Sequence, residues 1–218
     1  TVPARKLVDI CKNLPVDALI KFTVDEQRVL IQAGRSRFTL TTLPAADFPS
    51  SEETPGSLSF TVEQQQIRRL IERTSFAMAQ QDVRYYLNGL LLEAQQGQLR
   101  AVATDGHRLA LCTVPAQIEE NVQHQVIVPR KGVLELARLM TDEGAPVDIM
   151  LGHNYIRATT SDFTFTSKLV DGKFPDYDRV LPRGGDKELI GSRQLLRDTF
   201  NRAAILSNEK FHGIRLQL

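Results

Sequence analysis

The stretch VPARKLVDIC at residues 2–11 recurs as VPRKGVLELA at residues 128–137, and this pair decides the predicted fold. Each copy opens with a Val-Pro pair and continues with a helical pattern. The aligned positions on one helix face are Ala4, Leu7, Val8 and Cys11 in the first copy, and Arg130, Val133, Leu134 and Ala137 in the second. A Phe-Pro pair follows 46 residues after each Val-Pro pair, at Phe48 and Phe174. The chain therefore repeats with a period of 126 residues, from Val2 to Val128.

Strand patterns follow each of these helices, and a second repeated unit interleaves with the first. The strands are expected at 20–24, 29–32 and 38–41, and again at 147–151, 155–158 and 163–166. The second unit has a strand at 58–62, a helix face made of Ile67, Leu70, Ile71 and Thr74, and strands at 89–93, 99–103 and 107–112. The second copy of this unit is expected to start with a strand at Leu189-Ile190 and to end with a strand at 213–218. Its helix face consists of Leu196, Thr199, Phe200 and Ala203. Each half-domain is therefore predicted to be β-α-β-β-β, in an α+β fold with helices on one side of the sheets.

Two segments with linker composition, 49–57 and 182–186, divide the repeats into domains. The predicted domains are the second half of one domain at 1–49, a complete domain at 57–182 and the first half of a third domain at 187–218. Both ends of the chain fall within strand patterns, so we expect the protein to continue beyond them.

Charge is distributed unevenly along the chain. There are 27 basic and 26 acidic residues, a net charge of only +1, yet the four predicted helices together carry +7 and the remainder carries −6. Any amphipathic helix exposes charges to solvent. The same sign on all four nevertheless favours a basic surface that contacts phosphates without reading base sequence.

The sequence lacks the usual motifs of enzymes and membrane proteins. No Walker A, GxGxxG, HExxH or GxSxG element occurs, and the four histidines are scattered, so no catalytic, cofactor or metal site is predicted. Cys11 and Cys112 are expected to be buried free thiols in a reducing compartment. No apolar run approaches the roughly 18 residues of a membrane span, and no leader is evident, so we expect a cytoplasmic protein without a membrane partner.

The segment TDGHR at residues 104–108 allows two interpretations. An Asp-Gly pair between two strand patterns is typical of a two-residue hairpin turn. Asp105 beside His107 could also belong to a hydrolase acting on nucleic acid, with a second acid or metal ligand elsewhere. A sequence-specific DNA binder is a third class, but no helix start gathers Asn, Gln or Arg in the way such a protein requires.

Eight motifs that span the chain resemble the bacterial β sliding clamp family, the processivity subunits of DNA polymerase III. They are VPARK at 2–6, RSRF at 35–38, LPAADFP at 43–49, QDVRYYLNG at 81–89, ATDGHRL at 103–109, VIVPRKG at 126–132, FPDY at 174–177 and AAILSNEKF at 203–211. The resemblance implies the clamp fold, in which two subunits join head to tail in a ring, with helices lining a DNA hole and sheets outside. It also implies that an ATP-driven clamp loader places the ring on primed DNA, where it tethers the polymerase III α subunit. Other polymerases, ligase and mismatch-repair proteins would dock through short peptides, and the clamp would need no cofactor.

The resemblance also assigns site residues. DNA contacts fall on Arg5, Gln81, Tyr85, Tyr86 and Lys131, although the two tyrosines could instead belong to the core. The peptide pocket comprises Leu87, Thr104, Gly106, His107, Arg108, Leu109, Pro175, Arg179 and Val180, although His107 could simply be a solvent-facing turn residue. The subunit contact comprises Phe38, Leu40, Ile205 and Leu206, with Lys6 and Arg35 in ion pairs across the same seam. Phe38 and Leu40 alternate with threonines, a pattern that also suits ordinary core. Ile205 and Leu206 cannot both sit on one narrow helix stripe, so one is expected to be left for a partner.

Overall fold

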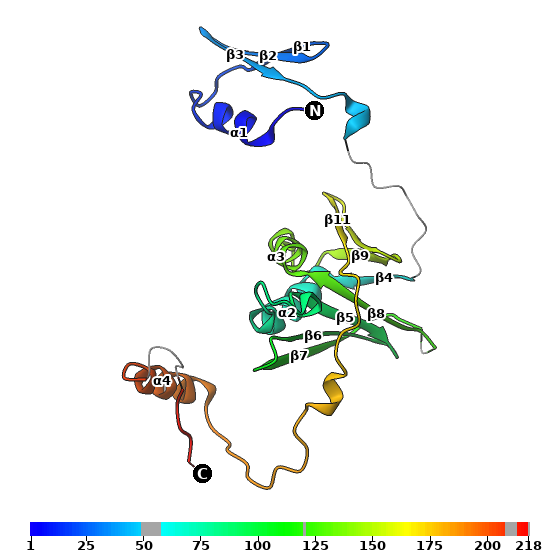
Figure 1. Cartoon of the computed structure of the whole chain (residues 1–218), viewed down its shortest axis with the longest axis vertical. Coiled ribbons are helices and arrows are strands. Elements are labelled where there is room, and N and C mark those ends of the chain that lie inside the picture. The colour runs from blue at the N-terminus through cyan, green and yellow to red at the C-terminus, as the bar shows by residue number, and fades with distance from the viewer. Residues whose placement is uncertain (49–57, 120, 208–212, 218) are drawn as a thin grey trace. The chain divides into compact units, whose positions relative to one another are not determined.

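The computed structural model describes residues 1–48, 58–119, 121–207 and 213–217. The chain forms two compact units, Thr1–Ser57 and Leu58–Leu218 (Figure 1). The predicted linker at 49–57 lies outside the described residues, as do positions 208–211 of the motif that begins at Ala203. The division into three clamp domains remains a prediction.

The first unit consists of one helix and a three-stranded antiparallel sheet. Helix α1 (Ala4–Lys12) begins directly after Pro3, whose fixed φ suits a helix start. Strands β1 (Lys21–Asp25), β2 (Arg28–Ala33) and β3 (Ser36–Thr41) pair in sequence order, and a short 3-10 turn, η1 (Ala45–Asp47), follows them. The three predicted strands are confirmed within one or two residues.

Burial in this unit differs from the prediction. The sheet buries Val29, Ile31 and Ala33 on its central strand, whereas α1 has no buried residue. Cys11 is exposed and Cys112 is half-buried, so the prediction of two buried thiols is wrong, although both are free. Helical spacing fixes which side chains share a face, but it does not fix whether another element covers that face.

The second unit contains two complete β-α-β-β-β repeats and a C-terminal helix. The first repeat comprises β4 (Leu58–Glu63), α2 (Gln64–Thr74), η2 (Ser75–Ala77), η3 (Tyr85–Leu87), β5 (Gly89–Gln95), β6 (Gln98–Thr104) and β7 (Leu109–Pro115). The second comprises β8 (Gln123–Pro129), α3 (Arg130–Leu139), β9 (Pro146–Leu151), β10 (Tyr155–Thr159) and β11 (Thr164–Lys168). The 3-10 turn η4 (Tyr177–Arg179) and helix α4 (Arg193–Ala204) follow.

The two repeats exchange their first strands. One sheet has the order β11-β10-β9-β4 and the other has the order β7-β6-β5-β8, so β4 and β8 each join the sheet of the opposite repeat. Phe60 on β4 pairs with Ile149 on β9, for example, and Leu91 on β5 pairs with Ile127 on β8. Because of this exchange, neither sheet is complete without the other repeat.

Helices α2 and α3 contact each other and pack on the inner faces of both sheets (Figure 1). The predicted face of α2 is confirmed, since Ile67, Leu70, Ile71 and Thr74 are all buried. A capping box begins α2: the Glu63 side chain accepts from the helix backbone, and the Glu63 N–H donates to Gln66 Oε1 at 3.0 Å. The core therefore lies between the helices and the sheets.

The predicted face of α3 is partly wrong. Val133 is buried and Ala137 packs against the core as expected, but Leu134 is 46% exposed and the other buried residues on this face are Leu136 and Met140. These three buried positions keep the i, i+3, i+7 spacing, so the buried face of α3 runs through Leu136 and not through Leu134.

Two turns show how glycine position decides loop length. The strands β5 and β6 are joined by Gln96 and Gly97, both with positive φ, which is the conformation of a two-residue type I′ hairpin. The predicted two-residue turn at Asp105-Gly106 is instead a four-residue loop, 105–108, because only Gly106 has a positive φ. Strand β7 consequently begins at Leu109 rather than at His107.

The C-terminal part of the unit contains less strand than predicted. Neither Leu189-Ile190 nor the described residues 213–217 form a strand. The helix α4 is confirmed and is capped by Ser192, whose Oγ accepts from the Leu195 N–H at 3.5 Å, but it has no buried residue. In the described parts of the chain, no helix is both long and apolar enough to cross a membrane. Among the same residues, no group of three or more His, Cys, Asp or Glu side chains is placed to hold a metal ion.

Candidate peptide pocket and nucleic-acid surface

A pocket of about 560 Å³ opens in the second unit among η3, the 105–108 loop and the segment that contains η4. Eight of the nine predicted pocket residues line it: Leu87, Thr104, Gly106, His107, Arg108, Leu109, Pro175 and Val180. Arg179 is not among the lining residues, and its guanidinium instead pairs with Asp176 at 2.8 Å. The fold thus gathers predicted residues from three separate stretches of the sequence.

The pocket is backed by a small apolar cluster that is separate from the main core. Leu87, Leu91, Val102, Ile127, Phe174 and Tyr177 are buried in this cluster, and Tyr86, Leu109 and Leu181 pack against it. Tyr86, Tyr177 and Leu181 also line the pocket, although they were not predicted to. The FPDY motif at 174–177 was the only sequence signal for Tyr177.

Side-chain hydrogen bonds hold the 105–108 loop in place. Asp105 Oδ1 accepts from the backbone N–H groups of His107 and Arg108 at 2.9 and 3.0 Å, and Oδ2 accepts from Arg108 Nε at 3.2 Å. Partial burial opposes ionisation of Asp105, but these bonds and the Arg108 charge outweigh it, so the pKa of Asp105 is lowered. The Asp105 carboxylate therefore holds the four-residue loop that replaces the expected two-residue turn.

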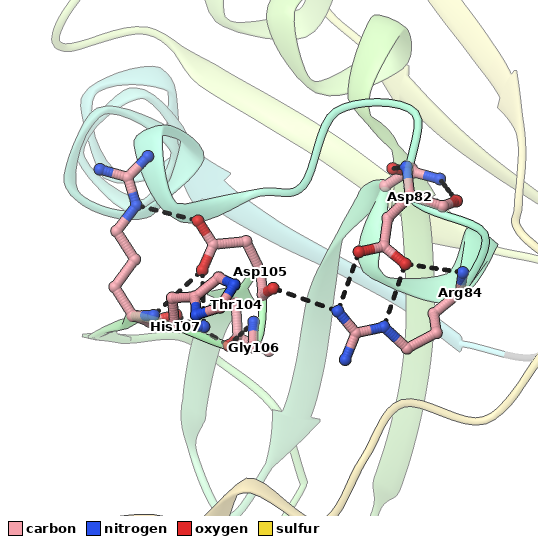
Figure 2. A network of polar contacts seen from close by, with 8 residues as sticks. Asp82, Arg84, Thr104, Asp105, Gly106 and His107 are labelled. Carbon is pink, nitrogen blue, oxygen red and sulfur yellow. Dashed lines mark hydrogen bonds and ion pairs between the residues drawn. The ribbon is translucent and has the colours of Figure 1, made fainter. Parts of the chain in front are cut away.

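Arg84 ties η3 to the same loop (Figure 2). Its guanidinium donates to both carboxylate oxygens of Asp82, at 3.0 and 2.8 Å, and to the Asp105 carbonyl at 3.3 Å. These bonds from Arg84 lower the pKa of Asp82 to about 2. A Cβ on Gly106 would lie 3.1 Å from the guanidinium, so the glycine gives Arg84 room to lie against the loop.

The predicted DNA-contact residues lie on exposed parts of both units. Gln81 is exposed on the segment that leads into η3, and Tyr85 is exposed at the first position of η3. Arg5 and Lys131 are exposed on α1 and α3. Tyr85 is 57% exposed, so it is not a core residue, whereas Tyr86 is half-buried against the pocket cluster. The two rings meet edge to face at 5.8 Å.

Each of the four α-helices in the described parts of the chain carries three basic side chains and one acidic side chain, apart from α2, whose acidic Glu63 stands at its N-cap. All of the basic residues are exposed except Arg130, which is half-buried. The helices therefore present cations to solvent in both units.

The predicted subunit-contact residues are also accessible. Phe38 and Leu40 are half-buried on β3, an edge strand of its sheet, where they alternate with exposed threonines. Ile205 and Leu206 are 77% and 94% exposed, so both, and not only one, are open to solvent. Lys6 and Arg35 are exposed.

Comparison with known families gives two matches. The DNA polymerase III beta subunit central domain matches residues 61–176, and the N-terminal domain of the same subunit matches residues 1–52. The chain belongs to the DNA polymerase III beta subunit family.

Curated relatives in this family are named beta sliding clamp. The Pseudomonas putida clamp is 71% identical over 218 residues, and the Escherichia coli K12 clamp is 55% identical over 216 residues. The chain spans 59% of the length of each of these relatives, while they match 100% and 99% of the chain.

Solved clamps share the fold. The Pseudomonas aeruginosa clamp bound to griselimycin is 70% identical, with a TM-score of 0.90 over 100% of this chain and 59% of its own. The Bacillus subtilis clamp is only 28% identical, yet has a TM-score of 0.86 over 95% of this chain and 55% of its own. The α+β clamp fold is therefore retained at low identity.

Proposed function

We propose that this protein is a sliding clamp that encircles duplex DNA and tethers DNA polymerase III to it. The observation that carries the proposal is the pocket, which combines an apolar floor of Leu87 and Leu109 with backbone and cationic groups at its rim. Such a site suits a short extended peptide, because the apolar floor receives anchoring side chains and the polar rim fixes the peptide backbone.

The charges of the helices support the DNA part of the proposal. Exposed cations on every helix contact phosphates in any base sequence, whereas the low net charge of the whole chain limits indiscriminate coating of DNA. The proposed partners are duplex DNA, the polymerase α subunit, the clamp loader, and the other polymerases, ligase and mismatch-repair proteins that carry clamp-binding peptides. The protein would act as a homodimeric ring in the cytoplasm, at the nucleoid.

A substitution in the pocket tests the proposal. In the full-length protein, Leu109→Asp places a charge in the apolar floor and is expected to abolish binding of a synthetic clamp-binding peptide, a polar residue followed by apolar ones, in calorimetry. Griselimycin, which the Pseudomonas aeruginosa clamp binds, serves as a second probe. Retention on circular DNA should be unchanged, since DNA is proposed to lie elsewhere.

The matched control is Leu134→Asp, on α3 and outside the pocket lining, where the side chain is 46% exposed. This variant should bind the peptide like the wild type. Equal peptide affinity in the wild type and Leu109→Asp would remove the assignment of the pocket.

We further propose that the clamp has no catalytic site of its own. The support is the Asp105 carboxylate, whose oxygens are occupied by the N–H groups of its own loop and by Arg108. A nuclease assay with Mg²⁺ or Mn²⁺ is expected to give no cleavage above a buffer blank, and cleavage that Asp105→Asn abolishes would restore the hydrolase interpretation.

A further inference from the structure

The outer face of the sheet β7-β6-β5-β8 is divided into an apolar row and a polar row. Paired positions across the strands place Ile127, Leu91 and Val102 side by side in the apolar row. Two residues further along, the same pairing places Gln125, Glu93, Arg100 and Thr113 side by side in the polar row. Side chains alternate between faces of a strand, so the two rows share the face opposite to α2 and α3.

The polar row is unusual because Glu93 within it is almost fully buried. Glu93 is 3% exposed, and a buried carboxyl group costs free energy unless hydrogen bonds satisfy it. It accepts hydrogen bonds from Gln125 Nε2 and from the Tyr177 hydroxyl, and Arg100 Nη1 lies 3.8 Å away. Arg100 also donates to the Tyr177 hydroxyl at 3.0 Å and to Thr113 Oγ1 at 3.3 Å.

Tyr177 spans both rows and comes from outside the sheet. Its ring packs with Leu91, Val102 and Phe174 in the apolar cluster, while its hydroxyl donates to Glu93 and accepts from Arg100. Burial and the hydrogen bond to Glu93 raise the pKa of Tyr177, so the hydroxyl keeps its proton and remains a donor. Tyr177 can pack its ring on the apolar row and bond its hydroxyl to the polar row at only one position on the sheet. A shift of one residue along the strand would separate the hydroxyl from Glu93 and Arg100.

The segment that Tyr177 anchors is one wall of the pocket. Pro175, Asp176, Val180 and Leu181 line the pocket beside Tyr177, and the Val180 N–H donates to the Tyr177 carbonyl at 3.0 Å. Beyond it, residues 182–190 have no helix or strand and are exposed. The wall therefore depends on its attachment to the sheet.

We propose that Glu93, Arg100 and Tyr177 form a positioning latch that fixes the 174–181 wall in the place where it completes the peptide pocket. The latch rests on the proposed peptide-binding function but adds residues that the resemblance did not assign. Glu93 and Arg100 do not line the pocket, so they act on the peptide only through Tyr177. Only molecules whose 174–181 wall is in place can bind the peptide. The apparent Kd is therefore the intrinsic Kd divided by the fraction of molecules in that state.

Tyr177→Phe in the full-length protein tests the latch, because it removes the hydroxyl and keeps the ring in the apolar row. We expect calorimetry to show that Kd for the synthetic clamp-binding peptide rises about tenfold, because the wall would be in its binding position only about a tenth of the time. In the peptide-free protein, hydrogen exchange of the Val180 amide should accelerate, while the amides of β5 and β6 should exchange at wild-type rates. DNA retention should be unchanged.

Two further variants separate positioning from general stability. Thr113→Val removes the other hydroxyl that Arg100 contacts but leaves the bond between Tyr177 and Glu93, so peptide affinity should match that of the wild type even if the melting temperature falls. Glu93→Gln keeps an acceptor for Tyr177 and should retain most of the affinity, whereas Glu93→Ala should lose it about as Tyr177→Phe does.

The outcomes distinguish the latch from the pocket assignment. If the wild type binds the peptide but Tyr177→Phe binds it within twofold, or if Thr113→Val loses as much affinity, the latch is wrong and the pocket stands. If even the wild type does not bind the peptide, the proposed function fails. In that case hydrogen exchange in the peptide-free Tyr177→Phe protein still tests the latch. Faster exchange confined to 174–181 would support the latch, whereas equally faster exchange in β5, β6 and 174–181 would show that Tyr177 is an ordinary core residue.

Discussion

At the scale of single residues, Arg84 is the clearest case in which one side chain joins two segments that line the pocket. It pairs with Asp82 on its own segment and donates to the Asp105 carbonyl across the pocket rim. Asp82 and Asn88 also bond each other reciprocally, at 2.9 and 2.8 Å, which closes the segment into a compact turn. The exposed Tyr85 and the pocket residue Leu87 are therefore held on one preformed piece of backbone.

The first prediction concerns the charge of Asp82. Its pKa of about 2 in the folded protein is lower than the ordinary 3.8, mainly because Arg84 hydrogen-bonds the carboxylate. A lowered pKa means that the ionised pair stabilises the fold fully above about pH 4 and that this contribution is lost as pH falls towards 2. We expect an NMR titration of the Asp82 carboxyl carbon to shift its midpoint upward, towards 3.8, in Arg84→Met.

A distant control accompanies that titration. Arg138→Met on α3, where Arg138 pairs only with Glu135 among the ion pairs described, should leave the Asp82 midpoint unchanged. If the Asp82 midpoint is the same in the wild type and in Arg84→Met, the bidentate ion pair between Arg84 and Asp82 does not persist in solution.

At the scale of elements, α3 illustrates why helical spacing alone does not fix which face of a helix is buried. The expected apolar stripe included Leu134, but burial falls on Val133, Leu136 and Met140, and Val8, the position of α1 that aligns with Leu134, is also 46% exposed. Val133 and Leu136 meet Ile67 and Leu70 of α2 and Leu92 of β5 in the core. Sequence spacing allows more than one apolar stripe when neighbouring leucines are available, and packing selects between them.

The second prediction compares two leucines on α3. Leu136→Ala should lower the free energy of unfolding by about 2–5 kcal/mol, because it removes a fully buried side chain and leaves a cavity. Leu134→Ala, the same change two positions earlier, should cost less than about 1 kcal/mol, since Leu134 is 46% exposed. Urea unfolding followed by circular dichroism measures both, and equal losses would contradict the orientation of α3.

At the scale of the whole molecule, the distribution of cations matters more than the net charge. Every helix has an excess of basic side chains although the chain as a whole is nearly neutral. Contacts to phosphate release condensed counterions, so affinity for DNA should fall with salt in proportion to the number of contacts.

The third prediction follows from that linkage. In the full-length protein, Arg5→Ala combined with Lys131→Ala should weaken DNA binding equally for unrelated sequences. It should also reduce the slope of log K against log salt by about one unit per lost contact. Fluorescence anisotropy at several salt concentrations measures the slope. Arg37→Ala, an exposed cation on β3 and not on a helix, is the matched control and should leave the slope unchanged. Unaltered binding of the double variant in low salt would show that the two residues face away from DNA.

The fourth prediction concerns assembly. Ile205 and Leu206 are both exposed beyond the end of α4, and we propose that both pack against a second subunit, near its Phe38 and Leu40. Ile205→Ala with Leu206→Ala should convert the full-length dimer into a folded monomer, through the loss of about 2–4 kcal/mol of apolar packing. A head-to-tail contact of this type closes into a ring when the rotation per subunit allows it.

Sedimentation at low protein concentration measures this change, with circular dichroism as the check on folding. The matched control is Val16→Ala with Leu19→Ala, which truncates two exposed aliphatics elsewhere and should leave the dimer intact. A dimer that persists in the Ile205 and Leu206 variant would contradict the assignment, as would unfolding that accompanies dissociation.

The sequence by itself determined the features that depend on neighbouring residues. Alternating apolar residues placed β2, β4, β9 and β10 within one or two positions, and helical spacing found the four α-helices that the described residues form, because both periods are set by local backbone geometry. The motif resemblance supplied the pocket residues, of which only Arg179 lies outside the lining.

Only the tertiary structure decided the features that depend on residues far apart. The exchange of β4 and β8 between repeats, the choice of the buried face of α3 and the exposure of Cys11 arise from packing between elements, which no local period encodes. The bond between Tyr177 and Glu93 joins positions 84 residues apart, and it exists because sheet pairing places Glu93 beside Arg100 under the 174–181 segment. A buried carboxyl group needs hydrogen-bond partners, and these are brought to it by the tertiary fold. The order of residues along the chain does not show which side chains will form those hydrogen bonds.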